Sequence, residues 1–117
     1  MRATTLAAGG LACAGAAMTI AAFAGGGHAQ PAAQPQVQAN RGEVVFAREG
    51  CSGCHTLAAA GSNGTVGPNL DDAKPPATLV VTRVTDGAGA MPSFKGKLTE
   101  QQIQDVAAYV SSAAGTS

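Results

Sequence analysis

Two cysteines separated by two residues and followed at once by a histidine stand at positions 51–55, as Cys51-Ser52-Gly53-Cys54-His55. In this arrangement the two thiols can add to the vinyl groups of a haem while the adjacent imidazole reaches its iron. The motif therefore predicts one covalently attached haem c and a protein that handles electrons. It restricts the fold more than any other feature, because the rest of a small chain must then be arranged around the haem.

The same two thiols have three other uses: half of a zinc site, a redox dithiol or a structural disulfide. Zinc needs two more ligands, and outside the motif the sequence offers only Cys13 and His28, both in a predicted export segment. A redox dithiol is expected after a strand in a βαβ unit, whereas the residues before Cys51 predict a short helix. The residues favour haem attachment, and a redox dithiol is the main alternative.

The N-terminal part of the chain is typical of an export signal. Residues 6–24 carry no charge and consist mostly of small and apolar side chains, and the only basic residue before them is Arg2. This pattern predicts a secretory signal peptide over residues 1–29, with cleavage after Ala29. The alternative is an uncleaved membrane anchor. Both interpretations send the rest of the chain out of the cytoplasm, because Arg2 stays on the cytoplasmic side.

The charge of the exported chain is close to zero. Seven basic and seven acidic residues are present in the sequence, and loss of Arg2 with the signal leaves six against seven, a formal charge of −1. Cys13 lies inside the apolar run, where we interpret it as part of the signal rather than as a lipoprotein site. A nucleic-acid partner is not expected for a chain with this charge.

Residues 30–39 contain two prolines and several glutamines without any hydrophobic period, which predicts a disordered tether. The folded domain is then expected over residues 40–117. Its first helix is predicted to begin at Asn40, where the sequence resembles a capping box, and to end near Gly50. Gly42 indicates either a close helix crossing or a merely tolerated glycine.

Residues 56–76 are rich in Gly, Ser, Asn, Asp and Pro, which predicts an irregular segment. So long a loop in a small domain is unusual unless it wraps something. We expect it to wrap the haem, with Val66 and Leu70 turned toward it.

A helix is predicted from Ala77 to Thr85, because a Pro pair precedes it and Gly87 follows it, although its Val and Thr content would favour a strand. In the glycine-rich loop after this helix, Met91 is the only thioether outside the predicted signal. An isolated Met is usually a core filler. Here the following Pro92 and the flexible glycines before it favour an axial ligand of the haem iron instead.

The last helix has the clearest local signals. A capping box begins at Thr99, and four apolar residues then follow the helical period. These residues are Ile103, Val106, Ala107 and Val110. Tyr109 is one position off this stripe, which indicates either a place at the crossing with Gly42 or a tyrosine at the surface edge.

Taken in order, these motifs resemble those of a class I monohaem cytochrome c of the bacterial or photosynthetic c6 or c551 kind. The matching residues are Gly42, Phe46, the motif at 51–55, Gly67-Pro68-Asn69-Leu70, Met91-Pro92 and Tyr109. The resemblance implies an all-α cytochrome c fold, with three to five short helices wrapped around one covalently bound haem. It covers essentially the whole of the predicted domain.

The resemblance also implies a set of haem contacts. Cys51 and Cys54 would form the thioether bonds, His55 would be the proximal iron ligand and Met91 the distal one. The Pro68 carbonyl would accept the Nδ1 proton of His55. The chain departs from many relatives in having no tryptophan, which puts the contacts of the haem propionates in question.

Three functions compete for such a domain: a diffusible electron carrier, a haem enzyme and a gas sensor. Ligation by His55 and Met91 would fill both axial positions, whereas catalysis or gas binding needs a vacant or displaceable one. The sequence therefore favours a carrier that is not an enzyme, and a haem enzyme or gas-binding domain is the alternative. We expect a monomer in the periplasm or at the extracytoplasmic membrane face, or in the thylakoid lumen of a photosynthetic source. Its partners would be a redox protein donor and a redox protein acceptor, with membrane contact only through a redox complex or an uncleaved anchor.

Overall fold

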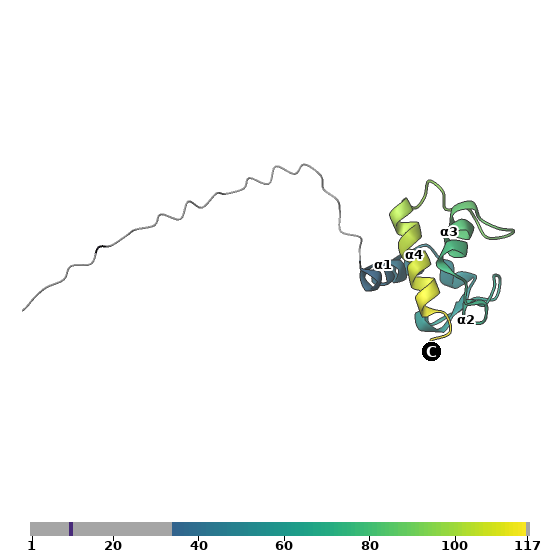
Figure 1. Cartoon of the computed structure of the whole chain (residues 1–117). Coiled ribbons are helices and arrows are strands. Elements are labelled where there is room, and N and C mark those ends of the chain that lie inside the picture. The colour runs from purple at the N-terminus through teal and green to yellow at the C-terminus, as the bar shows by residue number, and fades with distance from the viewer. Residues whose placement is uncertain (1–9, 11–33, 117) are drawn as a thin grey trace, which may run out of the picture.

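The computed structural model describes residue 10 and residues 34–116, which form a mostly helical domain with one two-stranded sheet (Figure 1). Its elements in chain order are α1 (Pro35–Arg48), β1 (Thr56–Leu57), β2 (Ser62–Asn63), α2 (Leu70–Ala73), α3 (Ala77–Asp86) and α4 (Glu100–Ala113). The expected set of three to five short helices is confirmed by the four α-helices of the described residues, with the small antiparallel sheet as an addition. Among the described residues, no helix is both long and apolar enough to cross a membrane.

Helix α1 begins at Pro35, so the predicted start at Asn40 is wrong. Pro35 occupies the first turn, where a missing N–H removes no helical hydrogen bond. The Gln34 carbonyl accepts hydrogen bonds from the next turn, and Asn40 accepts one from Gln36 instead of capping the helix. Residues 35–39 of the predicted tether are therefore helical. The predicted signal peptide and residues 30–33 lie outside the described part of the chain.

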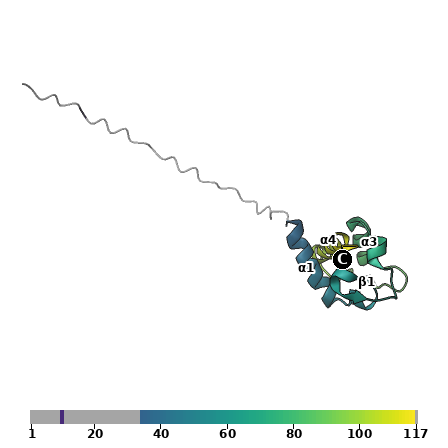
Figure 2. The same ribbon diagram turned by 90° about the horizontal axis from the view of Figure 1, so that it is seen from below.

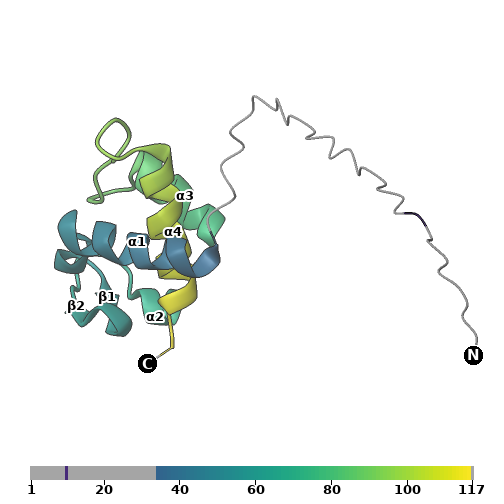
Figure 3. The same ribbon diagram turned by 90° about the vertical axis from the view of Figure 1, so that its left-hand side faces the viewer.

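Helices α1 and α4 cross at close range, as Figures 2 and 3 show. A Cβ atom on Gly42 would overlap the backbone carbonyl of Asp105 and would lie 2.6 Å from the Cβ of Tyr109. The rings of Phe46 and Tyr109 then meet edge to face, with centroids 5.8 Å apart. The close crossing that Gly42 and Tyr109 predict is thus confirmed, and Gly42 is more than a tolerated glycine.

An ion pair joins the same two helices beside the crossing. Both guanidinium nitrogens that face Asp105 donate to its carboxylate, with Arg41 Nε 2.8 Å from one oxygen and Nη2 3.1 Å from the other. Gln101 adds a third hydrogen bond to this carboxylate. The Asp105 side chain is only 3% exposed, whereas that of Arg41 is 45% exposed. The pair therefore has one buried and one solvated member.

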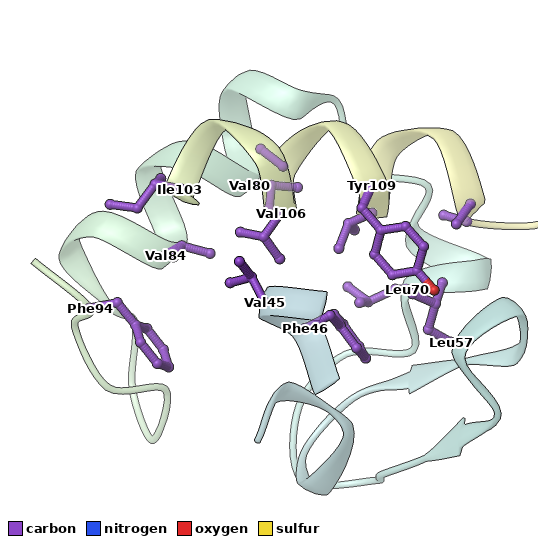
Figure 4. Packing of buried hydrophobic residues seen from close by; sticks show 14 of the residues in the cluster. Val45, Phe46, Leu57, Leu70, Val80, Val84, Phe94, Ile103, Val106 and Tyr109 are labelled. Atoms are coloured by element: carbon purple, nitrogen blue, oxygen red, sulfur yellow. The ribbon is translucent and has the colours of Figure 1, made fainter. Parts of the chain in front are cut away.

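The last helix forms as its local signals predict. The Thr99 hydroxyl accepts from the Gln102 N–H, and the Gln102 side chain accepts from the Thr99 N–H, which completes the capping box. The four residues of the predicted apolar stripe are all buried. Figure 4 shows Val106 and Tyr109 of α4 directed toward Val45 and Phe46 of α1, so this stripe builds one wall of the core.

The segment from Thr56 to Pro76 is less irregular than predicted. It contains β1, β2 and the four-residue helix α2, which gather at one end of the domain in Figure 3. The buried Ser62 hydroxyl accepts a hydrogen bond from the Leu57 N–H and donates one to the His55 carbonyl, and these bonds hold the strand pair together. The predicted helix of residues 77–85 is confirmed as α3, which ends at Asp86, one residue beyond its predicted last residue, and Gly87 follows it.

Candidate functional site

A largely apolar cavity of about 570 Å³ lies between the four helices and the loops that join them. All five residues predicted to contact a haem line this cavity: Cys51, Cys54, His55, Pro68 and Met91. Val66 and Leu70, which the sequence predicts to turn toward the cofactor, also line it. Cofactor sites in proteins commonly have roughly 300–1,000 Å³, so the cavity is large enough for a prosthetic group.

The cysteine motif folds into a tight turn that directly follows α1. Gly50 makes the reversal with a left-handed φ of 77°, and the Cys51 carbonyl then accepts hydrogen bonds from the N–H groups of Cys54 and His55. Burial raises the pKa of the Cys51 thiol to about 11, whereas Cys54 is exposed. The turn brings both sulfurs and the imidazole to the same cavity wall.

The His55 ring is held from two sides. Its Nδ1 lies 2.8 Å from the Pro68 carbonyl oxygen, and because a carbonyl only accepts, Nδ1 carries a proton; in the neutral imidazole this leaves the lone pair on Nε2. Gly67 packs flat against the ring, because a Cβ there would lie 2.6 Å from Cε1. The Gly67 N–H also donates to the Cys54 carbonyl at 2.7 Å. The structure thus gives Gly67 a close-packing role that could not be predicted from its place in a glycine-rich irregular segment.

Met91, which also lines the cavity, is carried by a closed hairpin. Ala88 and Met91 exchange two backbone hydrogen bonds, of 2.9 and 3.1 Å. Gly87, with a φ of 75°, packs so closely that a Cβ there would lie 2.7 Å from the Met91 carbonyl oxygen. The Ser93 hydroxyl donates to the Thr85 carbonyl at 2.6 Å and attaches the hairpin to the end of α3. Gly87 therefore serves close packing, beyond the flexibility expected from the sequence.

The alternative uses of the two thiols find no support in the described residues. Cys51 and Cys54 are not joined in a disulfide. Within the same described region, no three His, Cys, Asp or Glu side chains group closely enough to hold a metal ion. Helix α1, rather than a strand, precedes the motif, which is the context that argues against a thioredoxin-like dithiol.

Comparison with known proteins places the chain in a family. The family model described as cytochrome c oxidase, cbb3-type, subunit III matches residues 37–110. Cytochrome c6 of Leptolyngbya boryana is 44% identical over 64 residues, which are 51% of this chain and 75% of the relative. Cytochrome c6 of Synechocystis sp. is 34% identical over 73 residues, which are 59% of this chain and 60% of that protein.

A solved structure agrees with these matches. The crystal structure of the c-type cytochrome SorU from Sinorhizobium meliloti superposes with a TM-score of 0.65 at 44% identity, over 68% of this chain and 94% of that one. The chain belongs to the class I monohaem cytochromes c. This cytochrome c accordingly carries covalently bound haem c and transfers electrons.

The cavity of the cytochrome fits such a group. A haem is a broad, flat and mainly apolar ring, and the described cavity wall is built mostly from apolar side chains and backbone. Among the described residues, Arg83 is the only cationic side chain in that wall, and Glu49 is the only acidic one. Sequence reasoning did not single out Arg83, because its direction on α3 depends on how that helix packs.

Proposed function

We propose that this cytochrome c is a one-electron carrier in which Cys51 and Cys54 hold the haem and His55 and Met91 ligate its iron. The supporting observation is the arrangement of these four side chains around one cavity, together with the 2.8 Å hydrogen bond from His55 Nδ1 to the Pro68 carbonyl. When bound, the haem supplies an iron that alternates between the ferrous and ferric states. The residues around it bind it, orient its ligands and exclude water.

In this proposal each residue has a separate task. Pro68 keeps the proton on Nδ1, so that Nε2 of His55 stays available as a ligand, and the hydrogen bond raises the basicity of the imidazole. Met91 contributes a thioether, a soft donor that favours the reduced iron. With both axial positions filled, the domain suits electron transfer rather than catalysis or gas binding.

We further propose that the cytochrome works outside the cytoplasm, as a monomer that exchanges electrons with a donor and an acceptor protein. Support for export comes from the uncharged run at residues 6–24, which lies outside the described residues. Support for protein partners comes from the cytochrome c6 relatives. A membrane would then be contacted only through a redox complex or through an uncleaved anchor.

Met91→Ala tests the ligand assignment. The variant should keep its covalent haem but bind cyanide, and its reduction potential should fall by on the order of 0.1 V, within the roughly 0.8 V range that axial ligands cover. Optical titration and potentiometry measure both effects. Leu79→Ala is the matched control, because Leu79 also lines the cavity and loses apolar volume without losing a donor atom. If Met91→Ala excluded cyanide and kept the parent potential, Met91 would be a packing residue only.

A further inference from the structure

Two hydrogen bonds connect the segment after the cysteine motif to the segment that contains Pro68. The first joins His55 Nδ1 to the Pro68 carbonyl at 2.8 Å. The second joins the Ala58 N–H to Oδ2 of Asp71, also at 2.8 Å. Ala58 follows His55 by three residues and Asp71 follows Pro68 by three residues, so the two bonds form consecutive rungs between the same two segments.

Asp71 is itself held from several directions. Its other carboxylate oxygen, Oδ1, accepts the Gly115 N–H at 2.8 Å, which ties it to the end of α4. Its own N–H donates to the Asn69 side chain at 2.9 Å. The hydrogen bonds from Gly115 and Ala58 lower the pKa of Asp71. The carboxylate is therefore ionised at neutral pH, and both of its oxygens accept hydrogen bonds.

The two rungs are coupled through short lengths of chain. On one side, Leu57 and Ala58 are fixed by β1 and the turn that follows it. On the other, Pro68 and Asp71 are separated only by Asn69, which caps α2, and by Leu70, its first residue. If the bond from Ala58 were lost, the hydrogen bonds left between the Pro68 segment and the segment after the cysteine motif would be those of His55 to Pro68 and of Gly67 to Cys54. The Pro68 carbonyl would then be held less closely against the imidazole ring.

We propose that Asp71 is a positioning residue for the proximal histidine: its bond to the Ala58 N–H keeps the Pro68 carbonyl at hydrogen-bonding distance from His55. This inference rests on the proposed function, in which His55 ligates the iron. A hydrogen bond from Nδ1 to a carbonyl makes the imidazole a stronger donor to a metal, which favours the oxidised ion. Asp71 thereby acts on the reduction potential through two intervening groups, without touching the haem itself.

Asp72 provides a matched control for Asp71. The two residues are adjacent on α2 and carry the same charge, but the exposed Asp72 carboxylate accepts no hydrogen bond from the described residues. Asp71→Asn and Asp72→Asn therefore remove equal charges from neighbouring positions. Only the first disturbs the bonds to Ala58 and Gly115, because an Asn side chain has one acceptor oxygen for these two N–H donors.

Ala58→Pro removes the same rung from its donor side without changing any charge. Proline has no N–H, and Ala58 is the first residue of its short helical turn, where proline is tolerated. Leu57 before it has an extended backbone, with φ −151° and ψ 104°, as a residue that precedes proline requires. This variant also serves as the test if Asp71→Asn fails to fold.

The experiment measures hydrogen–deuterium exchange of the His55 Nδ1–H by NMR, together with the reduction potential, in the haem-loaded protein. We expect the exchange rate of this proton to increase about tenfold in Asp71→Asn and in Ala58→Pro, which corresponds to the free energy of about one hydrogen bond. In Asp72→Asn the rate should stay within about twofold of the parent rate. The potential should rise in Ala58→Pro, and should rise further in Asp71→Asn than in Asp72→Asn. Amide exchange in α4 should not change in Ala58→Pro, which separates the effect from general loosening.

Two results would overturn the inference in different ways. If the parent shows an iron-shifted His55 ring but the ring proton exchanges at the parent rate in both variants, Asp71 has no positioning role and the proposed ligation still stands. If the parent shows no iron-shifted His55 signal, the proposed ligation fails, and the role of Asp71 fails with it.

Discussion

The helix crossing and the cavity wall are built from the same kinds of side chain, yet they end in very different environments. Where α1 and α4 pack together, Val45 and Tyr109 are each 7% exposed, because the two helices cover each other's apolar side chains. In the cavity wall, Val66 is 70% exposed and Leu79 is 43% exposed. One half of the domain thus completes its own packing. The other half presents apolar surface that only a large apolar group can cover.

This difference indicates where the stability of the domain comes from. Small domains bury a low fraction of their surface and are marginally stable, so a prosthetic group that binds only the folded chain adds a large share of the free energy of unfolding. The crossing alone supplies a local core, which is shared by α1 and α4 and reinforced by the pair of Arg41 and Asp105. We therefore expect the two regions to respond very differently to substitution.

Loss of both thiols should have the largest effect. In Cys51→Ala with Cys54→Ala, haem should be released under denaturing conditions, and the domain should be largely unfolded because the cavity wall loses its apolar partner. Haem staining after denaturing electrophoresis and circular dichroism measure the two effects. Ser52→Ala, at the exposed position between the thiols, is the control that should keep both haem and fold. A double variant that folded without haem would show that the crossing is sufficient for the whole domain.

Gly42→Ala should give the next largest effect, now at the crossing. The added methyl group would overlap the Asp105 carbonyl, and neither backbone can yield without separating the helices. We expect a loss of about 3 kcal/mol in the free energy of unfolding, at the upper end for overpacking. Gly53→Ala is the control, because a Cβ there meets nothing within 4 Å. Equal denaturation midpoints for the two variants would mean that the crossing is not tightly packed.

Asp105→Asn should weaken the crossing less, and in a manner that depends on pH. Burial alone would raise the pKa of Asp105, but hydrogen bonds from Arg41 and Gln101 outweigh it and hold this pKa below its usual value. At neutral pH the free energy of unfolding of the variant should be lower by about 1.5 kcal/mol. This is the lower end of the range for a hydrogen bond to a charged group, because water screens the exposed Arg41.

The direction of the pH effect follows from the lowered pKa. A carboxylate whose pKa is lower in the folded than in the unfolded chain stabilises the fold at any pH above its unfolded-state pKa of about 3.9. This contribution is lost as the pH falls through the folded-state pKa. The stability difference between parent and Asp105→Asn should therefore be constant near neutral pH and disappear in acid below about pH 4. Denaturation curves across this range measure it, with the exposed Asp86→Asn as control. A difference that persisted unchanged in strong acid would assign the effect to packing.

How much of this could be predicted from the sequence depends on how local each signal is. Helix α4 and the motif at 51–55 are specified by neighbours three or four residues apart, so the capping box and the cavity-facing cysteines and histidine were predicted. The start of α1 was missed because its first turn has no apolar period, and only its proline and the Gln34 carbonyl mark it.

Contacts between residues that are far apart in the sequence could not be predicted from it. Arg41 bonds a residue 64 positions away, and Asp71 bonds one 44 positions away, so neither pair leaves a spacing that can be read along the chain. The contact of Gly67 with the His55 ring was hidden for another reason, since a glycine before a proline is an equally good turn signal. The residues predicted to contact a haem do line one cavity, while most of the groups that hold them there were not predicted.

Tyr109→Phe should have the smallest effect, and it should act in the opposite direction. The Tyr109 hydroxyl is buried at the crossing and has no hydrogen-bond partner among the described residues, and burial raises its pKa, with Glu43 contributing. Removing a polar group that is buried without a partner relieves its desolvation cost, while the ring keeps its contact with Phe46. We therefore expect the variant to be unchanged or more stable by up to about 1 kcal/mol in denaturant titrations. Phe46→Leu, which removes the aromatic contact from the other side, should instead destabilise the protein. A clear loss of stability in Tyr109→Phe would show that the hydroxyl has a hydrogen-bond partner in solution. The crossing of α1 and α4 would then also depend on a group outside the chain.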